Sequence, residues 1–190
     1  MIQLDVADPD QIDAMFAQID TEFGRLDALI NNAGIVAQTA RVTDLTHARL
    51  RQMFDVNVIG AILVAQGAVK RMEPAGKGVI INISSVAARL GSANLYVDYA
   101  ASKGAIDTFT RGLSDEVAPL GIRVMGLAPG LIETDIHAKG GEPDRAARMG
   151  STTPMGRAGT PQEIANAVLW LMSDEASYVT GSTLTVSGGR

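Results

Sequence analysis

The sequence contains no cysteine, no long uninterrupted apolar segment and no cluster of basic residues. Without cysteine the chain can form neither a disulfide nor a thiolate metal site, which fits a reducing compartment such as the cytoplasm. No apolar run reaches the roughly 18 residues that a membrane-spanning helix needs. The net charge is -5 and the Lys and Arg residues are scattered, whereas nucleic-acid binding needs a concentrated basic surface. We therefore expect a cytoplasmic protein that binds neither nucleic acid nor a membrane.

Metal-ligand spacing and a glycine-rich nucleotide motif are also missing. The two histidines, His47 and His137, have no metal-ligand spacing, so we expect no metal site. His137 lies in an irregular region, where solvent or a substrate-binding loop is the expected surrounding. The motif Gly-x-Gly-x-x-Gly, which follows the first strand of many dinucleotide-binding folds, does not occur. One Gly-x-Gly is present, Gly76-Lys77-Gly78, but it precedes an apolar run instead of following one.

The residues that are present predict one soluble α/β domain. The chain has 190 residues, of which 46% are apolar and 19% charged, enough to bury a sizeable core. Short apolar runs predict strands at residues 2–6, 26–30, 79–83, 122–128 and 182–186. Segments of helical periodicity predict helices at residues 9–23, 46–72, 97–118 and 160–172. This alternation predicts a doubly wound parallel sheet with helices on both faces, and ligands beyond the carboxyl ends of its strands.

The segment from Ser84 to Lys103 holds a candidate proton-transfer site. Tyr99 and Lys103 are four residues apart, so on a helix both side chains lie on one face, one turn from each other. Tyr96 is the competing phenol, but it has alanine four residues later. Ser84 and Ser85 follow the apolar run 79–83, and either could supply a hydroxyl group to the same place.

Together these residues resemble those of the short-chain dehydrogenase/reductase family. The similarity covers nearly the whole chain in family order: Asn31-Asn32-Ala33-Gly34, Asn57, Ser85, Tyr99 with Lys103, Pro129-Gly130 and Thr134. The segment 96–107 is similar to a subgroup described as sugar dehydrogenase-like or oxoacyl reductase-like. The resemblance implies a single Rossmann-like domain over residues 1–190, NAD or NADP as cofactor, and the interconversion of a small secondary alcohol and a ketone by hydride transfer.

The resemblance also implies catalytic roles for four residues. A free tyrosine has a pKa of about 10, and a neighbouring ammonium together with an oxidised nicotinamide would favour its phenolate. Tyr99 is then the acid/base that exchanges a proton with the substrate oxygen. Family spacing favours Ser85 over Ser84 as the residue that holds this oxygen. Lys103 would tune Tyr99, and Asn57 would position a water that relays the proton.

The first half of the implied cofactor site lies near the start of the chain. The family pattern assigns adenine contacts to the Asp5 side chain and the Val6 backbone. Asn32, Ala33 and Gly34 would lie along the adenosine ribose, where small residues allow close approach of the backbone.

The second half of the implied cofactor site lies on three later segments. Tyr99 and Lys103 would contact the nicotinamide ribose. Pro129 and Gly130 would line the nicotinamide face. The remaining contacts are the backbone of Ile132 to the carboxamide and Thr134 to the pyrophosphate.

Several of these residues also have plain structural explanations. Asn57 inside an apolar helix needs hydrogen-bond partners and could be a satisfied structural residue. The loop 31–34 could be a strand-to-helix turn, and Asp5 could simply lead into the first helix. Gly140-Gly141 predicts either a flexible loop over the site or an ordinary surface loop.

The similarity begins at what would be the third strand of the family fold. The first two strands, two helices and the glycine-rich loop have no counterpart, so we expect an N-terminally truncated domain with one exposed strand edge. The chain is then either a fragment or a natural short form. In the second case it could be a catalytically inactive remnant that acts only through oligomer contacts. The family resemblance implies a homo-oligomer, a dimer or tetramer, built through the helices that begin near Thr46 and Val97 and through the last strand.

Overall fold

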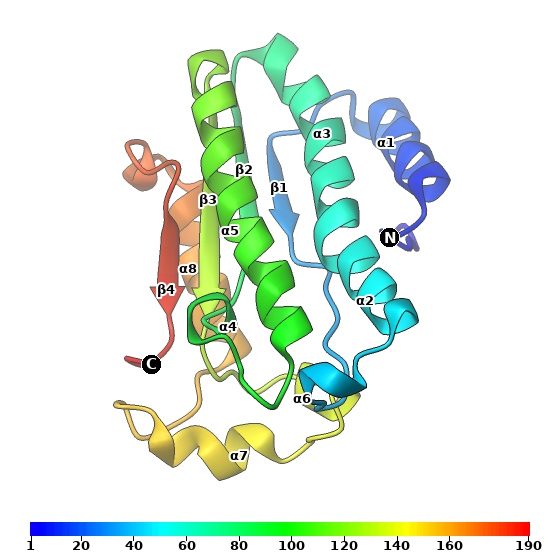
Figure 1. The fold of residues 1–190 in the computed structure, drawn as a ribbon. Helices are drawn as coiled ribbons and strands as arrows, with labels where there is room; N and C mark the ends of the chain where they lie inside the picture. The colour runs from blue at the N-terminus through cyan, green and yellow to red at the C-terminus, as the bar shows by residue number, and fades with distance from the viewer.

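The computed structural model describes residues 1–190 and places one parallel sheet between two layers of helices (Figure 1). The four strands are β1 (Ala28–Asn31), β2 (Gly78–Ile83), β3 (Ile122–Pro129) and β4 (Thr183–Val186), and they pair in that order, all in parallel. Strands β2 and β3 are buried on both faces, which explains their continuous apolar sequences. The Rossmann-like α/β fold is therefore confirmed.

Helices cover both faces of this sheet. They are α1 (Pro9–Phe23), α2 (His47–Phe54), α3 (Ala61–Met72), α4 (Ala87–Leu90), α5 (Val97–Val117), α6 (Ile136–Lys139), α7 (Arg145–Met149) and α8 (Pro161–Met172). On one face, Phe16 of α1 and Val64 of α3 pack with Ile80 of β2 in the larger core cluster. On the other face, Leu171 of α8 packs with Met125 of β3 in a second cluster. Both apolar faces of the central strands are thus removed from water.

The helix boundaries follow the capping residues of the sequence. Asp8 caps α1 by accepting from the backbone N–H groups of Asp10 and Gln11, and Gly24 ends the helix with a φ of 65°. Thr160 and Glu163 form a reciprocal capping box at the start of α8. The predicted starts of both helices are confirmed.

The strand predicted at residues 2–6 does not form. Residues 1–5 have no regular structure, and no strand pairs with β1 on its outer side. A strand needs a partner for its backbone groups, and this segment pairs with none of the four strands, including the edge strand β1. Val6 packs instead against the larger core cluster, close to Gly60. Strand β1 is left as an open edge, as predicted, and Ile30 on it remains 39% exposed.

The predicted helix 46–72 is present but not uniform. Residues Asp55–Gly60 form a π-helical segment between α2 and α3, with Asn57 in its middle. The sequence did not predict this change of winding. Such π-helical segments are often found at functional sites.

The same helical stretch, His47–Ala75, is long and apolar enough to cross a membrane, with a window of mean hydropathy 1.4. Core helices of soluble proteins meet this criterion as well. Here Val64, Ala65 and Ala68 face the interior and are almost completely buried. Length and composition alone are therefore weak grounds for a membrane segment.

The region from Leu131 to Gly159, expected to be irregular, contains the short helices α6 and α7. They lie beyond the carboxyl ends of the strands, across the end of the sheet where ligands bind in such folds (Figure 1). Leu131, Ala146 and Ala158 form a small apolar cluster that holds this region together.

Candidate active site

A cavity of about 1000 Å³ opens at the carboxyl ends of the strands. Its size is at the upper end of the range of ligand-binding pockets. Tyr99 and Lys103 of α5, Ser85 after β2, and Pro129 and Gly130 at the end of β3 all line it. The fold thus brings the candidate proton-transfer residues into a single space.

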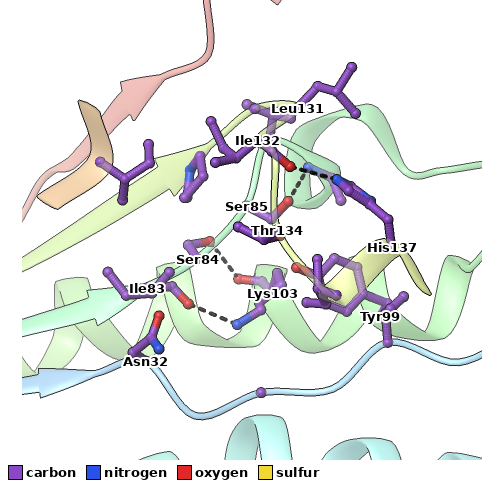
Figure 2. Close-up of a pocket in the computed structure, with 18 of the residues that line it drawn as sticks. Asn32, Ile83, Ser84, Ser85, Tyr99, Lys103, Leu131, Ile132, Thr134 and His137 are labelled. Atoms are coloured by element: carbon purple, nitrogen blue, oxygen red, sulfur yellow. Dashed lines mark hydrogen bonds between the residues drawn. The ribbon is translucent and has the colours of Figure 1, made fainter. Parts of the chain in front are cut away.

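Tyr99 and Lys103 occupy one face of α5, one turn apart, as their spacing predicts. The Lys103 ammonium lies 5.8 Å from the centre of the Tyr99 ring. Figure 2 shows Ser85 and Tyr99 at the cavity, with Lys103 deeper and directed toward β2. The Tyr96 ring packs edge to face on Tyr99, with 5.8 Å between the ring centres. Tyr99 is therefore the tyrosine that has both Ser85 and Lys103 as neighbours.

Lys103 is a buried cation. It is only 5% exposed, and its Nζ donates a hydrogen bond of 2.8 Å to the carbonyl of Ile83. Burial lowers the pKa of Lys103 from 10.5 to about 8, although the charge of Asp107 raises it. The ammonium group has no carboxylate within ion-pair distance, so its remaining donors are available to a ligand.

The surroundings of Tyr99 act on its pKa in opposite directions. Burial raises the pKa of the phenol above its ordinary value of 10.0, a hydrogen bond with Ser85 lowers it, and Tyr96 raises it. Burial has the largest effect, so Tyr99 is protonated at neutral pH. This is the state from which a phenol donates a proton to a forming alkoxide.

The structure separates the two competing serines. Ser84 is 2% exposed, and its hydroxyl donates to the backbone carbonyl of Lys103 at 3.3 Å. Ser85 is half-buried, accepts from the backbone N–H of Ala87 at 3.1 Å and interacts with Tyr99. Ser84 joins β2 to α5, whereas the hydroxyl of Ser85 lies beside the phenol.

Asn57 lies one layer behind the cavity and has several hydrogen bonds. Its Oδ1 accepts from the backbone N–H of Ile35 at 2.8 Å, and its Nδ2 donates to the Ile35 carbonyl at 2.9 Å and to Ser102 Oγ at 3.1 Å. These bonds fix the loop that follows β1. A Cβ atom added to Gly34 would lie 3.4 Å from both Asn57 Oδ1 and Lys103 Nζ. The structural explanation of Asn57 therefore has direct support, and its relay role stays a prediction.

Most of the predicted cofactor residues line the cavity, but Asp5, Val6 and Ala33 do not. Besides Tyr99 and Lys103, the lining includes Asn32, Gly34, Pro129, Gly130, Ile132 and Thr134. Ala33 is not part of the lining. Asp5 and Val6 also lie outside it: Asp5 is exposed and accepts from the backbone N–H of Ala7, and Val6 packs beside Gly60. The structure gathers the residues implied at the nicotinamide end, with Asn32 and Gly34 of the implied adenosine-ribose contacts, but not the adenine contacts Asp5 and Val6.

Glu142 and Arg145 line the cavity, although neither was predicted as part of the site. Arg145 and Glu142 form an ion pair of 3.0 Å beside α7, and the Arg145 guanidinium lies 5.3 Å from the centre of the Tyr96 ring. The spacing of Glu142 and Arg145, three residues apart, is typical of a pair on one side of a helical turn. The sequence could therefore have predicted the ion pair between Glu142 and Arg145, but not that Arg145 lies beside Tyr96.

The two histidines lie apart in the sequence, and no cluster of three or more His, Asp or Glu side chains could hold a metal ion. His137 lines the cavity, and its Nε2 makes a 2.8 Å hydrogen bond with the Ile132 carbonyl (Figure 2). It therefore has a partner in the loop that carries the predicted cofactor contacts.

The whole chain is similar to proteins of a known family. A family model described as enoyl-(acyl carrier protein) reductase matches residues 1–190. An uncharacterized oxidoreductase of Escherichia coli K12, YgfF, is 51% identical over 193 residues, which cover 100% of this chain and 78% of that protein.

Two solved structures share the fold closely. A short-chain type dehydrogenase/reductase from Mycobacterium marinum has a TM-score of 0.92 and 33% identity, covering 98% of this chain and 73% of that one. The structure of ElxO with NADP bound has a TM-score of 0.89 and 31% identity, covering 98% and 75%. The chain belongs to the short-chain dehydrogenase/reductase family, whose members are NAD(P)-dependent oxidoreductases. The cofactor expected from the sequence, NAD or NADP, is thereby confirmed at the level of the family.

Proposed function

We propose that this chain carries the proton-transfer site of an NAD(P)-dependent oxidoreductase that interconverts a secondary alcohol and a ketone. The observation that carries the proposal is the convergence of the Tyr99 phenol, the Ser85 hydroxyl and the buried Lys103 ammonium on one cavity. A small-molecule substrate suits a cavity of about 1000 Å³. The lack of cysteine supports a cytoplasmic location.

In this proposal Tyr99 is the acid/base and Ser85 orients the substrate oxygen. The protonated phenol donates to the carbonyl oxygen during reduction and recovers the proton from the alcohol during oxidation. Lys103 supplies positive charge that stabilises the phenolate left by this transfer, at 5.8 Å from the ring centre. Asn57 fixes the loop after β1 through its two hydrogen bonds with the Ile35 backbone. It is also assigned the water relay of the family pattern.

The nicotinamide end of the cofactor fits the residues present. When bound, the cofactor supplies or accepts the hydride. Gly130 lines the cavity and packs closely on Ser187, because a Cβ atom at Gly130 would lie 2.7 Å from the Ser187 Cα atom. The cavity offers donors suited to ribose and phosphate, namely the Lys103 ammonium, the Asn32 amide and the Thr134 hydroxyl. The two implied adenine contacts are absent from the cavity, because Asp5 and Val6 lie elsewhere.

Titration of the chain with NADH and NADPH tests this function. We expect binding at micromolar concentrations, measured by calorimetry. Thr134→Val should weaken binding about tenfold, because it removes one hydrogen bond to a charged group. Thr43→Val is the control, because Thr43 is exposed and does not line the cavity. No binding of either nucleotide would favour the catalytically inactive remnant instead.

We also propose that the chain forms a homo-oligomer, a dimer or a homotetramer. Leu50 and Ile59 are apolar and 36% and 43% exposed on the helix that spans α2 and α3, and Leu184 is 37% exposed on the edge strand β4. These residues lie on the elements that the family resemblance assigns to subunit contacts, where association would bury their apolar side chains. This proposal holds for the enzyme and for the inactive remnant alike.

Light scattering tests the oligomeric state. We expect a mass of two or four chains, and Ile59→Lys should shift the distribution toward smaller species. Val42→Lys is the matched control, because Val42 is apolar and 70% exposed but lies outside the α2–α3 helix. A monomeric mass at concentrations of tens of micromolar, a range in which stable oligomers persist, would contradict the proposal.

A further inference from the structure

Arg145 has features of a ligand-binding residue. Its side chain is 10% exposed, and one of its N–H groups donates to Glu142 at 3.0 Å. A guanidinium has five N–H donors, so most of those of Arg145 have no acceptor in the protein. No buried side-chain nitrogen lacks a partner, so the free donors reach solvent, and Arg145 lines the cavity that contains Tyr99. The free donors therefore have access to a molecule bound in the active site.

The Arg145 guanidinium is held beside the catalytic phenol by aromatic contacts. Its Cζ lies 5.3 Å from the centre of the Tyr96 ring, and Tyr96 packs at 5.8 Å on Tyr99. A cation over an aromatic ring is attracted to it and keeps a defined orientation. A single ring thus separates the guanidinium from the residue assigned as acid/base.

The charge around Arg145 is not balanced. Glu142 also pairs with Arg148, at 2.7 Å, so one carboxylate serves two guanidinium groups. Burial raises the pKa of Glu142, but the hydrogen bonds and charges of Arg145 and Arg148 together lower it by more. The carboxylate is therefore ionised. The three side chains together carry one net positive charge. This local excess is notable in a protein whose net charge is -5.

We propose that Arg145 binds a carboxylate group of the substrate, so that the reaction interconverts a hydroxy acid and an oxo acid. This inference rests on the proposed oxidoreductase function and names the class of its substrate. A guanidinium can hold a carboxylate through two parallel hydrogen bonds, which match its planar arrangement of donors. The free donors of Arg145 would take this role while Glu142 fixes its remaining N–H.

The test compares charged and neutral ligands of the same shape. Benzoate and benzamide differ only in replacing a carboxylate by an amide, and calorimetry gives their affinities for the unmodified chain without any turnover. We expect benzoate to bind at least about tenfold more tightly, a preference that should weaken as salt increases. Equal affinities for the two ligands would overturn the proposal. Tighter binding of phenyl phosphate than of benzoate would overturn the assignment to a carboxylate.

Variants then assign the preference to one side chain. Arg145→Met should abolish the preference for benzoate, and Arg145→Lys should retain part of it through the remaining charge. Arg111→Met should leave it unchanged, because Arg111 is 67% exposed, pairs with Asp115 and does not line the cavity. If Arg145→Met fails to fold by circular dichroism, the unmodified chain and Arg145→Lys still decide. A full preference in Arg145→Met would overturn the role of Arg145.

The binding test and the proposed oxidoreductase function can fail separately. Binding of benzoate requires neither a cofactor nor a proton transfer. A lack of preference would therefore remove the carboxylate site and leave the role of Tyr99 standing. Conversely, loss of the oxidoreductase proposal would not change which ligand the guanidinium binds.

Discussion

Tyr99→Phe is expected to lower the rate at which the protein reduces ketones with NADH or NADPH. The expected decrease is a factor of about 10² to 10⁴, the usual contribution of a positioned acid or base. The substitution removes one oxygen atom and keeps the ring that packs against Tyr96 and near Lys103. The fold and the affinity for the reduced cofactor should therefore change little. The measurement is the loss of reduced-cofactor absorbance with a panel of ketones and oxo acids.

Tyr178→Phe is the matched control for this experiment. The chain has three tyrosines, and Tyr178 is fully exposed at the surface. The same loss of a phenolic oxygen there should leave turnover unchanged. Turnover in Tyr99→Phe equal to that of the unmodified chain would contradict the assignment of Tyr99 as acid/base. Equal melting curves of the two variants would show that the loss comes from the chemistry.

Local sequence signals predicted most of the fold. The buried strands β2 and β3 were recognisable because both of their faces are apolar, and α1 and α8 because Asp8 and Thr160 are strong capping residues. The strand expected at residues 2–6 failed for a non-local reason. Its apolar pattern is suitable, but the segment does not pair with the edge strand β1, and Val6 packs against the larger core cluster instead. A strand depends on its partner in a way that a capped helix does not.

In the candidate site, too, contacts within one element could be predicted from the sequence, whereas contacts between distant segments could not. The spacing of Tyr99 and Lys103 along one helix fixes their relation, so sequence alone could pair them. Arg145 could not be found in this way, because it reaches Tyr96 only through the folding of the segment after β3. The sequence also did not predict the π-helical winding around Asn57, or the hydrogen bonds that join this side chain to Ile35, which is 22 residues away.

Lys103 links the active site to the stability of the fold. Burial lowers the pKa of Lys103 to about 8 in the folded chain, from 10.5 for an ordinary lysine. Between these two values the unfolded chain keeps the proton and the folded chain releases it. Since the unfolded state then binds more protons, the free energy of unfolding rises with pH in this window. Below it, the fold bears the full cost of a buried ammonium, roughly 3 kcal/mol for such a difference in pKa.

Lys103→Met should remove this pH dependence. Between about pH 7.5 and pH 9.5 we expect the free energy of unfolding of the unmodified chain to gain about 2 kcal/mol from Lys103, a gain that the variant lacks. Urea unfolding at both pH values measures it, and the difference between the two proteins cancels the contributions of other groups. Lys70→Met, which removes an exposed lysine from α3, should keep the full gain. An equal pH dependence in Lys103→Met and the unmodified chain would mean that the ammonium is not desolvated. In that case Lys103 would be an ordinary solvated cation, and its effect on the Tyr99 phenol would be too weak to stabilise a phenolate at neutral pH.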